Sequence, residues 1–215
     1  MSLDEWIALW SLALAATFTP GPNTTLSTAL GAQGGLRHAL PFVSAVPVGW
    51  VLLLGLCSAG VGAAVLEAPA LRGVMVWGGA GYLLWLAWQI GRSASLPGST
   101  SDKLTISFGR GVMLQFLNPK AWMLVLAIVA GWIGGMPQAG ARFAQALPVV
   151  VGCTLGSNLL YAWVGSRLQP WLEGPIIEGQ PSGRRLRRFN AVMGLALAIS
   201  ALWMLLRAQP AAPMG

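Results

Sequence analysis

The amino-acid sequence predicts an all-α integral membrane protein of about six transmembrane helices, arranged as two inverted three-helix repeats. Three observations carry this prediction. Hydrophobic residues make up 55% of the 215-residue chain and charged residues only 9%, whereas about 25% charged residues is usual in a globular protein. The charged residues fall between long apolar runs. Two of these runs carry proline-containing breaks at matching positions.

The apolar runs define the predicted helices. An α-helix needs about 20 apolar residues to cross roughly 30 Å of hydrocarbon. The six runs that contain no Asp, Glu, Lys or Arg are 6–36, 39–66, 73–91, 121–141, 143–166 and 189–206. The last run is the shortest, so the predicted number of spans depends most on it.

The first run is interrupted by the sequence Thr19-Pro20-Gly21-Pro22-Asn23. Proline has no backbone N–H and obstructs the preceding helical turn. We therefore expect one half-helix to end near Thr19 and another to begin near Asn23. Two acidic residues precede the run, where a cleavable signal peptide would carry basic ones, so we expect this run to be a structural helix.

The second and third runs are rich in glycine, which we interpret as a means of close helix packing. Pro41 and Pro47 should kink the second run. In the fifth run Gly152 and Gly156 are spaced four residues apart. We expect this pair to form a similar packing face.

The fourth run begins directly after the sequence Asn118-Pro119-Lys120. Asparagine is a favourable helix N-cap, and proline is well tolerated at the first helical position. We therefore expect a half-helix to begin at Pro119. Its first N–H groups and the positive end of its dipole would face the break.

The breaks lie at corresponding places in two halves of the chain, the first at Pro20, Gly21 and Pro22 and the second at Asn118 and Pro119. Each opens a group of three runs. Because three is odd, the second group must enter the membrane in the opposite orientation. We predict a first repeat over 1–92, a cytoplasmic loop over 93–107 and a second repeat over 108–215, within one membrane domain. Matching broken segments of this kind are typical of transporter sites.

The basic residues are distributed unequally between the two sides of the predicted membrane domain. The loops after the first, third and fifth runs carry nine Lys or Arg residues, and the opposite side carries three. Cytoplasmic loops carry the excess of basic residues, so both termini are predicted to lie outside. Four arginines between 184 and 188 are typical of contact with anionic membrane lipid. No basic domain with interspersed aromatic residues remains to bind nucleic acid.

We expect the breaks to form a substrate site. Backbone groups freed inside a membrane must face protein or a water-filled cavity, and a helix N-terminus attracts anions, so a carboxylate is the expected ligand. Lys120 is the charged residue nearest the middle of an apolar stretch, and such residues usually mark function. The alternative is that Lys120 extends to the cytoplasmic interface.

The candidate substrate-binding residues are the members of the breaks and the amides that accompany them. They are Pro20, Gly21, Pro22, Asn23, Gln115, Asn118, Pro119, Lys120 and Asn158. Asn158 lies in an otherwise apolar part of the fifth run. An interhelical hydrogen bond explains it equally well.

No enzyme, metal or cofactor site is predicted. The six acidic residues all lie at chain ends or in loops, so no pair of carboxylates lies within a run. Cys57 and Cys153 lie in the middle of runs and are interpreted as small apolar residues. His38 has no neighbouring metal ligands.

Over most of its length the chain resembles the LysE/RhtB family of amino-acid exporters, the LysE-type translocators. The residues that carry the resemblance are the first break, Gly34-Gly35-Leu36-Arg37, the sequence from Gly81 to Trp88, the sequence from Gln115 to Trp122, and Asn190 with Gly194. The resemblance implies a bacterial inner-membrane exporter driven by the proton gradient. Within it, Pro20, Gly21, Pro22, Asn23, Asn118, Pro119 and Lys120 match motif positions. Residues 40–49 depart from the family's usual glycine-rich second span, which leaves the substrate open.

The predicted function is therefore the export of amino acids or related small metabolites. The alternative is a channel-like or non-transporting membrane component that binds lipid or a partner protein through its glycine faces and arginine cluster. This alternative rests on the lack of acidic residues within the runs, which weakens any carboxylate proton relay. The sequence leaves the solute, the coupling ion and the formation of a homo-oligomer open.

Overall fold

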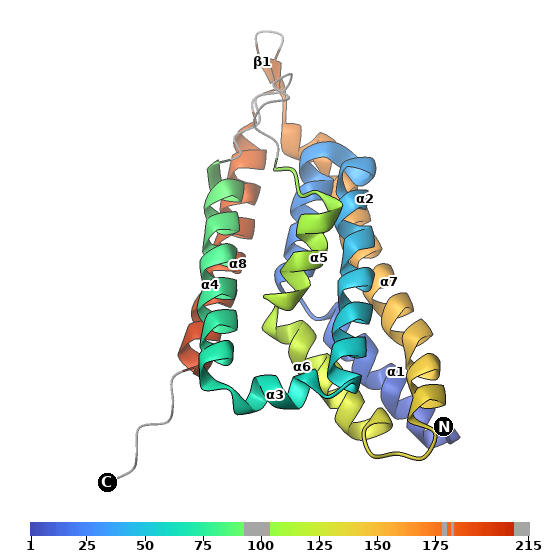
Figure 1. Cartoon of the computed structure of the whole chain (residues 1–215). Coiled ribbons are helices and arrows are strands. Elements are labelled where there is room, and N and C mark those ends of the chain that lie inside the picture. Colours follow the sequence, from blue (N-terminus) through green and yellow to red (C-terminus); the bar gives the residue numbers. More distant parts are fainter. Residues whose placement is uncertain (93–103, 178–179, 182, 209–215) are drawn as a thin grey trace.

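The computed structural model describes residues 1–92, 104–177, 180–181 and 183–208, and these are almost entirely helical (Figure 1). The elements in chain order are α1 (Leu3–Phe18), α2 (Pro22–Ser58), α3 (Val61–Glu67), α4 (Pro69–Arg92), α5 (Phe108–Phe116), α6 (Pro119–Ile128), the π-helix η2 (Val129–Ile133), α7 (Ala139–Glu173), β1 (Ile176–Ile177), β2 (Gln180–Pro181) and α8 (Arg184–Ala208). The two short strands pair antiparallel, a hairpin that the sequence did not predict.

Several described helices are long and apolar enough to cross a membrane. Three do so individually, namely α2, α7 and α8 over residues 184–206. The pair formed by α5 and residues 119–133 adds a fourth candidate, bent by 66° at the second break. α1 has only 16 residues, fewer than the length of about 20 that a span requires. The prediction of an all-helical, multi-pass membrane protein is confirmed at this level.

The long helix α2 consists of two helical segments that meet at Gly35. This residue has φ 77° and ψ 177°, outside the helical region, and glycine adopts positive φ without steric cost. The chain turns back between the two segments, which lie side by side in Figure 1. The segment before Gly35 continues from the first break, and the segment after it contains Pro41 and Pro47.

Helix α7 packs closely along α2 through two glycines. A Cβ atom at Gly31 would collide with the carbonyl oxygen of Ala162, and one at Gly165 with the carbonyl oxygen of Thr28. Small residues at such crossings allow two backbones to approach. These two glycines allow α2 and α7 to pack closely against each other.

The expected packing face of Gly152 and Gly156 has no neighbouring helix within the described chain. Both residues are exposed, and a Cβ atom at either would meet nothing within 4 Å. Glycine spacing identifies a surface that permits close approach. It does not identify which surface has a neighbouring helix.

Helices α4 and α8 lie side by side and form a pair next to the other helices (Figure 1). A Cβ atom at Gly194 would lie 2.7 Å from the carbonyl oxygen of Ala87, so glycine permits this contact. On another face of α4, Gly79 packs against the carbonyl oxygen of Leu117. The α4–α8 pair therefore contacts the second break directly.

Some predicted boundaries differ from the observed ones. The run 121–141 was expected to be helical throughout, but η2 ends at Ile133 and α7 begins at Ala139. Gly135 and Gln138 between them have positive φ angles of 69° and 57°. α7 also continues through Pro170 to Glu173, where a loop was expected. A run without charged residues can lie within a membrane, but the lack of charge does not show where the helix ends.

The segment that enters α5 is held against the turn in α2. The backbone N–H of Leu104 donates to Gln33 Oε1 at 3.0 Å, and His38 Nε2 lies 2.7 Å from the Leu104 carbonyl oxygen. Leu104 and Ile106 are both buried. His38 therefore has a structural contact here, and the predicted loop 93–107 lies within the described residues only from 104 onward.

Candidate functional site

The first break separates α1 from α2. α1 ends at Phe18 and α2 begins at Pro22, which confirms the predicted end near Thr19 and start near Asn23. The backbone N–H of Gly21 donates to Thr24 Oγ1 at 2.9 Å and so caps the new helix. At the end of α1, the Tyr161 hydroxyl donates to the Phe18 carbonyl oxygen at 2.9 Å.

The second break separates α5 from α6. α5 ends at Phe116, and Asn118 Oδ1 accepts the backbone N–H of Lys120 at 3.1 Å. Pro119 is the first residue of α6, so the predicted N-cap followed by proline is confirmed. Trp122 Nε1 donates to the Phe116 carbonyl oxygen at 2.9 Å, which holds the two helix ends together.

The two breaks contact each other, although they are 101 residues apart in the sequence at this contact. Lys120 Nζ donates to the carbonyl oxygen of Thr19 at 2.6 Å. Asn23 Nδ2 donates to Gln115 Oε1 at 2.7 Å, and Gln115 Nε2 lies 3.3 Å from Asn23 Oδ1. Residues predicted independently in each half therefore form one cluster.

Gln115 holds this cluster in place. Its side chain is fully buried. Its Oε1 also accepts Trp50 Nε1 at 2.9 Å, and its Nε2 donates to the Gly111 carbonyl oxygen at 3.0 Å. Because both polar atoms are already hydrogen-bonded, Gln115 positions the second break and offers no free group to a ligand.

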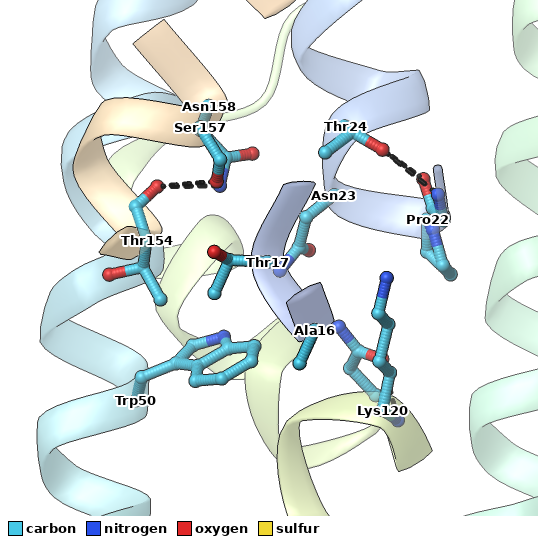
Figure 2. A pocket seen from close by; sticks show the side chains of 12 residues that line it. Ala16, Thr17, Pro22, Asn23, Thr24, Trp50, Lys120, Thr154, Ser157 and Asn158 are labelled. Atoms are coloured by element: carbon cyan, nitrogen blue, oxygen red, sulfur yellow. Dashed lines mark hydrogen bonds between the residues drawn. The ribbon is translucent and has the colours of Figure 1, made fainter. Parts of the chain in front are cut away.

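A small cavity lies beside the breaks (Figure 2). Its volume is about 20 Å³, which is enough for about one water molecule. Figure 2 shows Lys120 extending from α6 towards Pro22. The cavity is lined by residues of α1, α2, α6 and α7 and of the breaks, namely Ala16, Thr17, Gly21, Pro22, Asn23, Thr24, Trp50, Asn118, Lys120, Thr154, Ser157 and Asn158.

The cavity includes most of the predicted site residues. Those that line it are Gly21, Pro22, Asn23, Asn118, Lys120 and Asn158. Pro20, Pro119 and Gln115 do not line it. The two prolines lie where helices end or begin, and Gln115 lies behind the cavity wall.

Asn158 combines the two roles that the sequence left open. Its Oδ1 accepts the Ser27 hydroxyl at 2.8 Å, which is an interhelical hydrogen bond. Its Nδ2 donates to the Thr154 carbonyl oxygen at 2.8 Å. The residue nevertheless lines the cavity.

Sequence reasoning missed several lining residues on α7 and elsewhere. Thr154 and Ser157 share a helix face with Asn158, because residues three and four apart are neighbours on a helix. This polar stripe in an apolar run was a usable signal. Trp50 comes from the middle of α2, and nothing in its local sequence distinguishes it from the other tryptophans.

The backbone gives the cavity an electrical asymmetry. The carbonyl of Ala16 would normally accept the N–H of residue 20, but that residue is proline. The carbonyl of Thr17 would accept the N–H of Gly21, which instead donates to Thr24. The negative end of α1 therefore faces the same cavity as Lys120 and the positive ends of α2 and α6.

Acidic side chains are absent from the described cavity lining. Among the described residues, no three His, Cys, Asp or Glu side chains gather to hold a metal ion. The polar groups available to a ligand are therefore hydroxyls, amides, backbone groups and one ammonium.

The chain is similar in sequence to known translocator and efflux proteins. A family model described as "LysE type translocator" matches residues 14–207. The chain is 29% identical over 159 residues to a cysteine/O-acetylserine efflux protein of Escherichia coli O1:K1 and to its counterpart in Escherichia coli strain K12. The same identity is found with the protein of that name from Shigella flexneri serotype 5b. Each match covers 74% of this chain and 75% of the relative. No solved structure matches the chain.

Proposed function

The chain belongs to the LysE type translocator family and exports amino acids or related small metabolites, and we propose that its substrate binds where the two helix breaks meet. The family assignment favours a transporter over the non-transporting component considered from the sequence. The observation that carries the proposed site is the contact between Lys120 Nζ and the Thr19 carbonyl oxygen at 2.6 Å. It places the one charged side chain of the cavity lining between the two breaks.

Our proposal for the membrane arrangement is six crossings in two inverted repeats, 1–92 and 108–215. α1 and the segment of α2 before Gly35 would form one broken span, matched by α5 and α6 in the second repeat. The rest of α2, α4, α7 and α8 would supply the other spans. The contact between the two breaks supports this arrangement, because inverted repeats bring corresponding broken segments together near the membrane midplane.

The backbone polarity of the cavity fits a zwitterionic amino acid. Its carboxylate would bind Lys120 and the N-terminal N–H groups of the half-helices, since helix N-termini favour anions. Its ammonium would bind the carbonyl oxygens of Ala16 and Thr17 at the C-terminal end of α1, where the helix dipole is negative. The two ends of the ligand would thus face opposite partial charges.

The lining side chains favour a small neutral substrate with a polar side chain. Thr24, Thr154 and Ser157 contribute hydroxyls, and Lys120 would repel a second positive charge. The relatives are named for cysteine and O-acetylserine, which are small neutral amino acids with polar or polarisable side chains. We propose that this chain transports substrates of the same class.

Substrate entry requires the cavity to expand. A volume of about 20 Å³ holds about one water and not an amino acid. A substrate carboxylate would compete with the Thr19 carbonyl oxygen for Lys120. We therefore propose that substrate binding breaks the contact between α1 and α6, which frees the two breaks to separate.

Lys120 is also the proposed site of proton coupling. Among the twelve described residues that line the cavity it is the only one whose side chain readily exchanges a proton. Loss of that proton would remove both its attraction for a carboxylate and its positive charge. After the substrate is released, the uncharged Lys120 side chain could therefore move back to its starting position.

The proposed site is tested by transport in proteoliposomes that contain the purified chain. Lys120→Ala should lower counterflow of O-acetylserine by about tenfold or more, because a charge-assisted hydrogen bond contributes about 1.5–3 kcal/mol. Asn118→Ala should also impair it, because α6 loses its cap. Arg167→Ala is the matched control, since Arg167 is exposed and stacks on Trp163 at 5.4 Å from the ring centroid.

Three results would count against this proposal. Normal counterflow by Lys120→Ala and Asn118→Ala would show that the substrate does not bind at the breaks. Equal transport of lysine and O-acetylserine by the unaltered chain would remove the proposed preference for neutral substrates. A pH gradient that drives Lys120→Arg as well as it drives the unaltered chain would remove Lys120 from proton coupling, because arginine does not deprotonate in proteins.

A further inference from the structure

A groove separate from the substrate cavity lies between α4 and α5. Its volume is about 290 Å³, and it is lined by Tyr82, Trp85, Gly109, Arg110, Met113, Leu114 and Leu117. None of these residues lines the substrate cavity. The groove is therefore distinct from the substrate cavity.

The lining of the groove is apolar and faces the surroundings of the bundle. Met113 is 63% exposed and Trp85 is 41% exposed. The rings of Tyr82 and Trp85 pack with their centroids 5.3 Å apart. In a membrane protein such an exposed apolar surface contacts lipid chains.

Arg110 supplies a positive charge to this apolar groove. It is the third residue of α5 and is exposed. Within the described part of the chain it has no acidic partner, since the ion pair found there joins Arg142 to Glu5. Three other arginines, Arg92, Arg167 and Arg185, instead lie over tryptophan rings. The guanidinium of Arg110 is thus available to an anion.

The position of Arg110 along the bundle also favours a lipid. The end of α4, the start of α5 and the start of α8 lie at the same end of the molecule (Figure 1). Arg92, Arg110 and the four arginines between 184 and 188 are therefore near one membrane surface. Basic pockets between transmembrane helices at such a surface bind anionic headgroups.

We propose that the groove binds an anionic phospholipid, with its phosphate on Arg110 and one acyl chain along Tyr82, Met113 and Leu117. A water-soluble anion would gain nothing from the apolar lining, and an uncharged lipid would leave Arg110 unused. The occupant of this groove must therefore combine a negative head with an apolar tail.

The bound lipid would stabilise the helix that carries the second break. Leu114 and Leu117 form part of the groove, while Gln115 between them reaches the opposite side to bond Asn23 and Trp50. Leu117 also contacts α4 at Gly79. A lipid in the groove would fix α5 against α4 without touching the substrate cavity.

The test is native mass spectrometry of the full chain with phosphatidylglycerol or phosphatidylcholine of the same acyl composition. We expect preferential retention of phosphatidylglycerol, and about fivefold weaker retention by Arg110→Gln, because one arginine near an anionic surface contributes about 1 kcal/mol. Arg92→Gln is the matched control at the end of α4, where Arg92 lies 4.6 Å from the Trp88 ring centroid. It should bind as the unaltered chain does.

A second variant fills the groove without removing charge. A Cβ atom at Gly109 would meet nothing within 4 Å, so Gly109→Leu should fold normally and reduce the retention of both lipids. Equal retention of the two lipids by the unaltered chain, or an equal effect of Arg92→Gln and Arg110→Gln, would overturn the proposal. A dimer that Gly109→Leu dissociates would show that the occupant is a second copy of the chain and would also overturn it.

Discussion

Gln115 makes four hydrogen bonds to three residues, although it does not line the cavity. The variant Gln115→Leu would leave the partly buried Asn23 amide and the buried Trp50 N–H without their partner. Each unsatisfied group costs about 1–3 kcal/mol. We expect a lower melting temperature in detergent and a loss of transport, measured by light scattering and by counterflow.

A matched glutamine provides the control for this prediction. Gln169 lies near the end of α7 and donates to Glu173 Oε1 at 3.1 Å. Because this partner is one helical turn away and partly accessible, Gln169→Leu should leave the melting temperature and transport close to those of the unaltered chain. Equal effects of the two substitutions would show that Gln115 has no special positioning role.

Individual residues differed in how far the sequence could identify them. Lys120 could be identified from the sequence because a charged group within an apolar run has a high free-energy cost and usually has a function. Asn118 could be found because a cap followed by proline has local rules. Trp50 and Thr17 could not, because they reach the cavity through the packing of α1 and α2 against other helices. The roles of all these residues in substrate binding remain predictions.

The ion pair between Glu5 and Arg142 joins the start of α1 to α7 at 2.8 Å. Glu5 precedes the apolar run, and the neighbouring Arg142 guanidinium lowers the pKa of its carboxyl group. A lowered folded-state pKa stabilises the protein above the unfolded-state pKa, and this contribution is lost as the pH falls through the folded-state pKa. Melting temperatures should therefore fall on acidification below the usual carboxyl range.

The variant Glu5→Gln should show a smaller decrease over that acidic range, with a slightly lower melting temperature at neutral pH. Asp4→Gln is the matched control, because Asp4 is the adjacent acid and is exposed. It should keep the pH dependence of the unaltered chain. Parallel pH profiles for Glu5→Gln and the unaltered chain would contradict this account.

At the scale of helices, the prolines predicted the interruptions better than composition predicted the boundaries. Proline acts locally through its missing N–H, so both breaks lie within one residue of their expected positions. The reversal at Gly35 depends on a positive φ angle that the sequence Gly34-Gly35 permits but does not require. The end of η2 and the length of α7 depend on turn geometry and tertiary packing, which a hydrophobicity pattern does not contain.

Gly165 and Gly152 provide a paired test of helix packing on α7. A Cβ atom at Gly165 would collide with the Thr28 carbonyl oxygen, whereas one at Gly152 would meet nothing within 4 Å. Gly165→Ala should displace α7 from α2, lower the melting temperature by several degrees and impair transport. Gly152→Ala should be tolerated, since alanine also favours helix over glycine by up to about 1 kcal/mol.

The opposite result at Gly152 would be informative about assembly. If Gly152→Ala is as damaging as Gly165→Ala, the exposed face of α7 has a partner that the single chain does not show. Cross-linking of the purified protein would then distinguish a second copy from a different protein. The sequence left the formation of a homo-oligomer open, and the same cross-linking would detect one.

At the scale of the whole molecule, sequence symmetry predicted the contact between residues that are distant in the chain. Two breaks at the start of two three-run groups implied a common site, and Lys120 does contact Thr19. The pairing of α4 with α8 was not predicted. It depends on Gly194 lying against Ala87, a contact that no local pattern specifies. Local rules therefore predicted the site better than they predicted the packing around it.

The unequal distribution of basic residues makes a prediction about the orientation of the whole molecule. With six crossings, the loop after α4 and the turn before α8 lie on the nine-charge side, and both termini lie on the three-charge side. Positive loops remain in the cytoplasm.

Alkaline phosphatase fused after residue 208 should be active outside the cytoplasm, whereas the same enzyme fused after residue 92 should be inactive. Green fluorescent protein at the same two positions is the reciprocal control, because it should fluoresce at 92 and not at 208. Phosphatase activity at 92 alone would reverse the orientation, and activity at both positions would show an even number of crossings between them, in place of the three proposed.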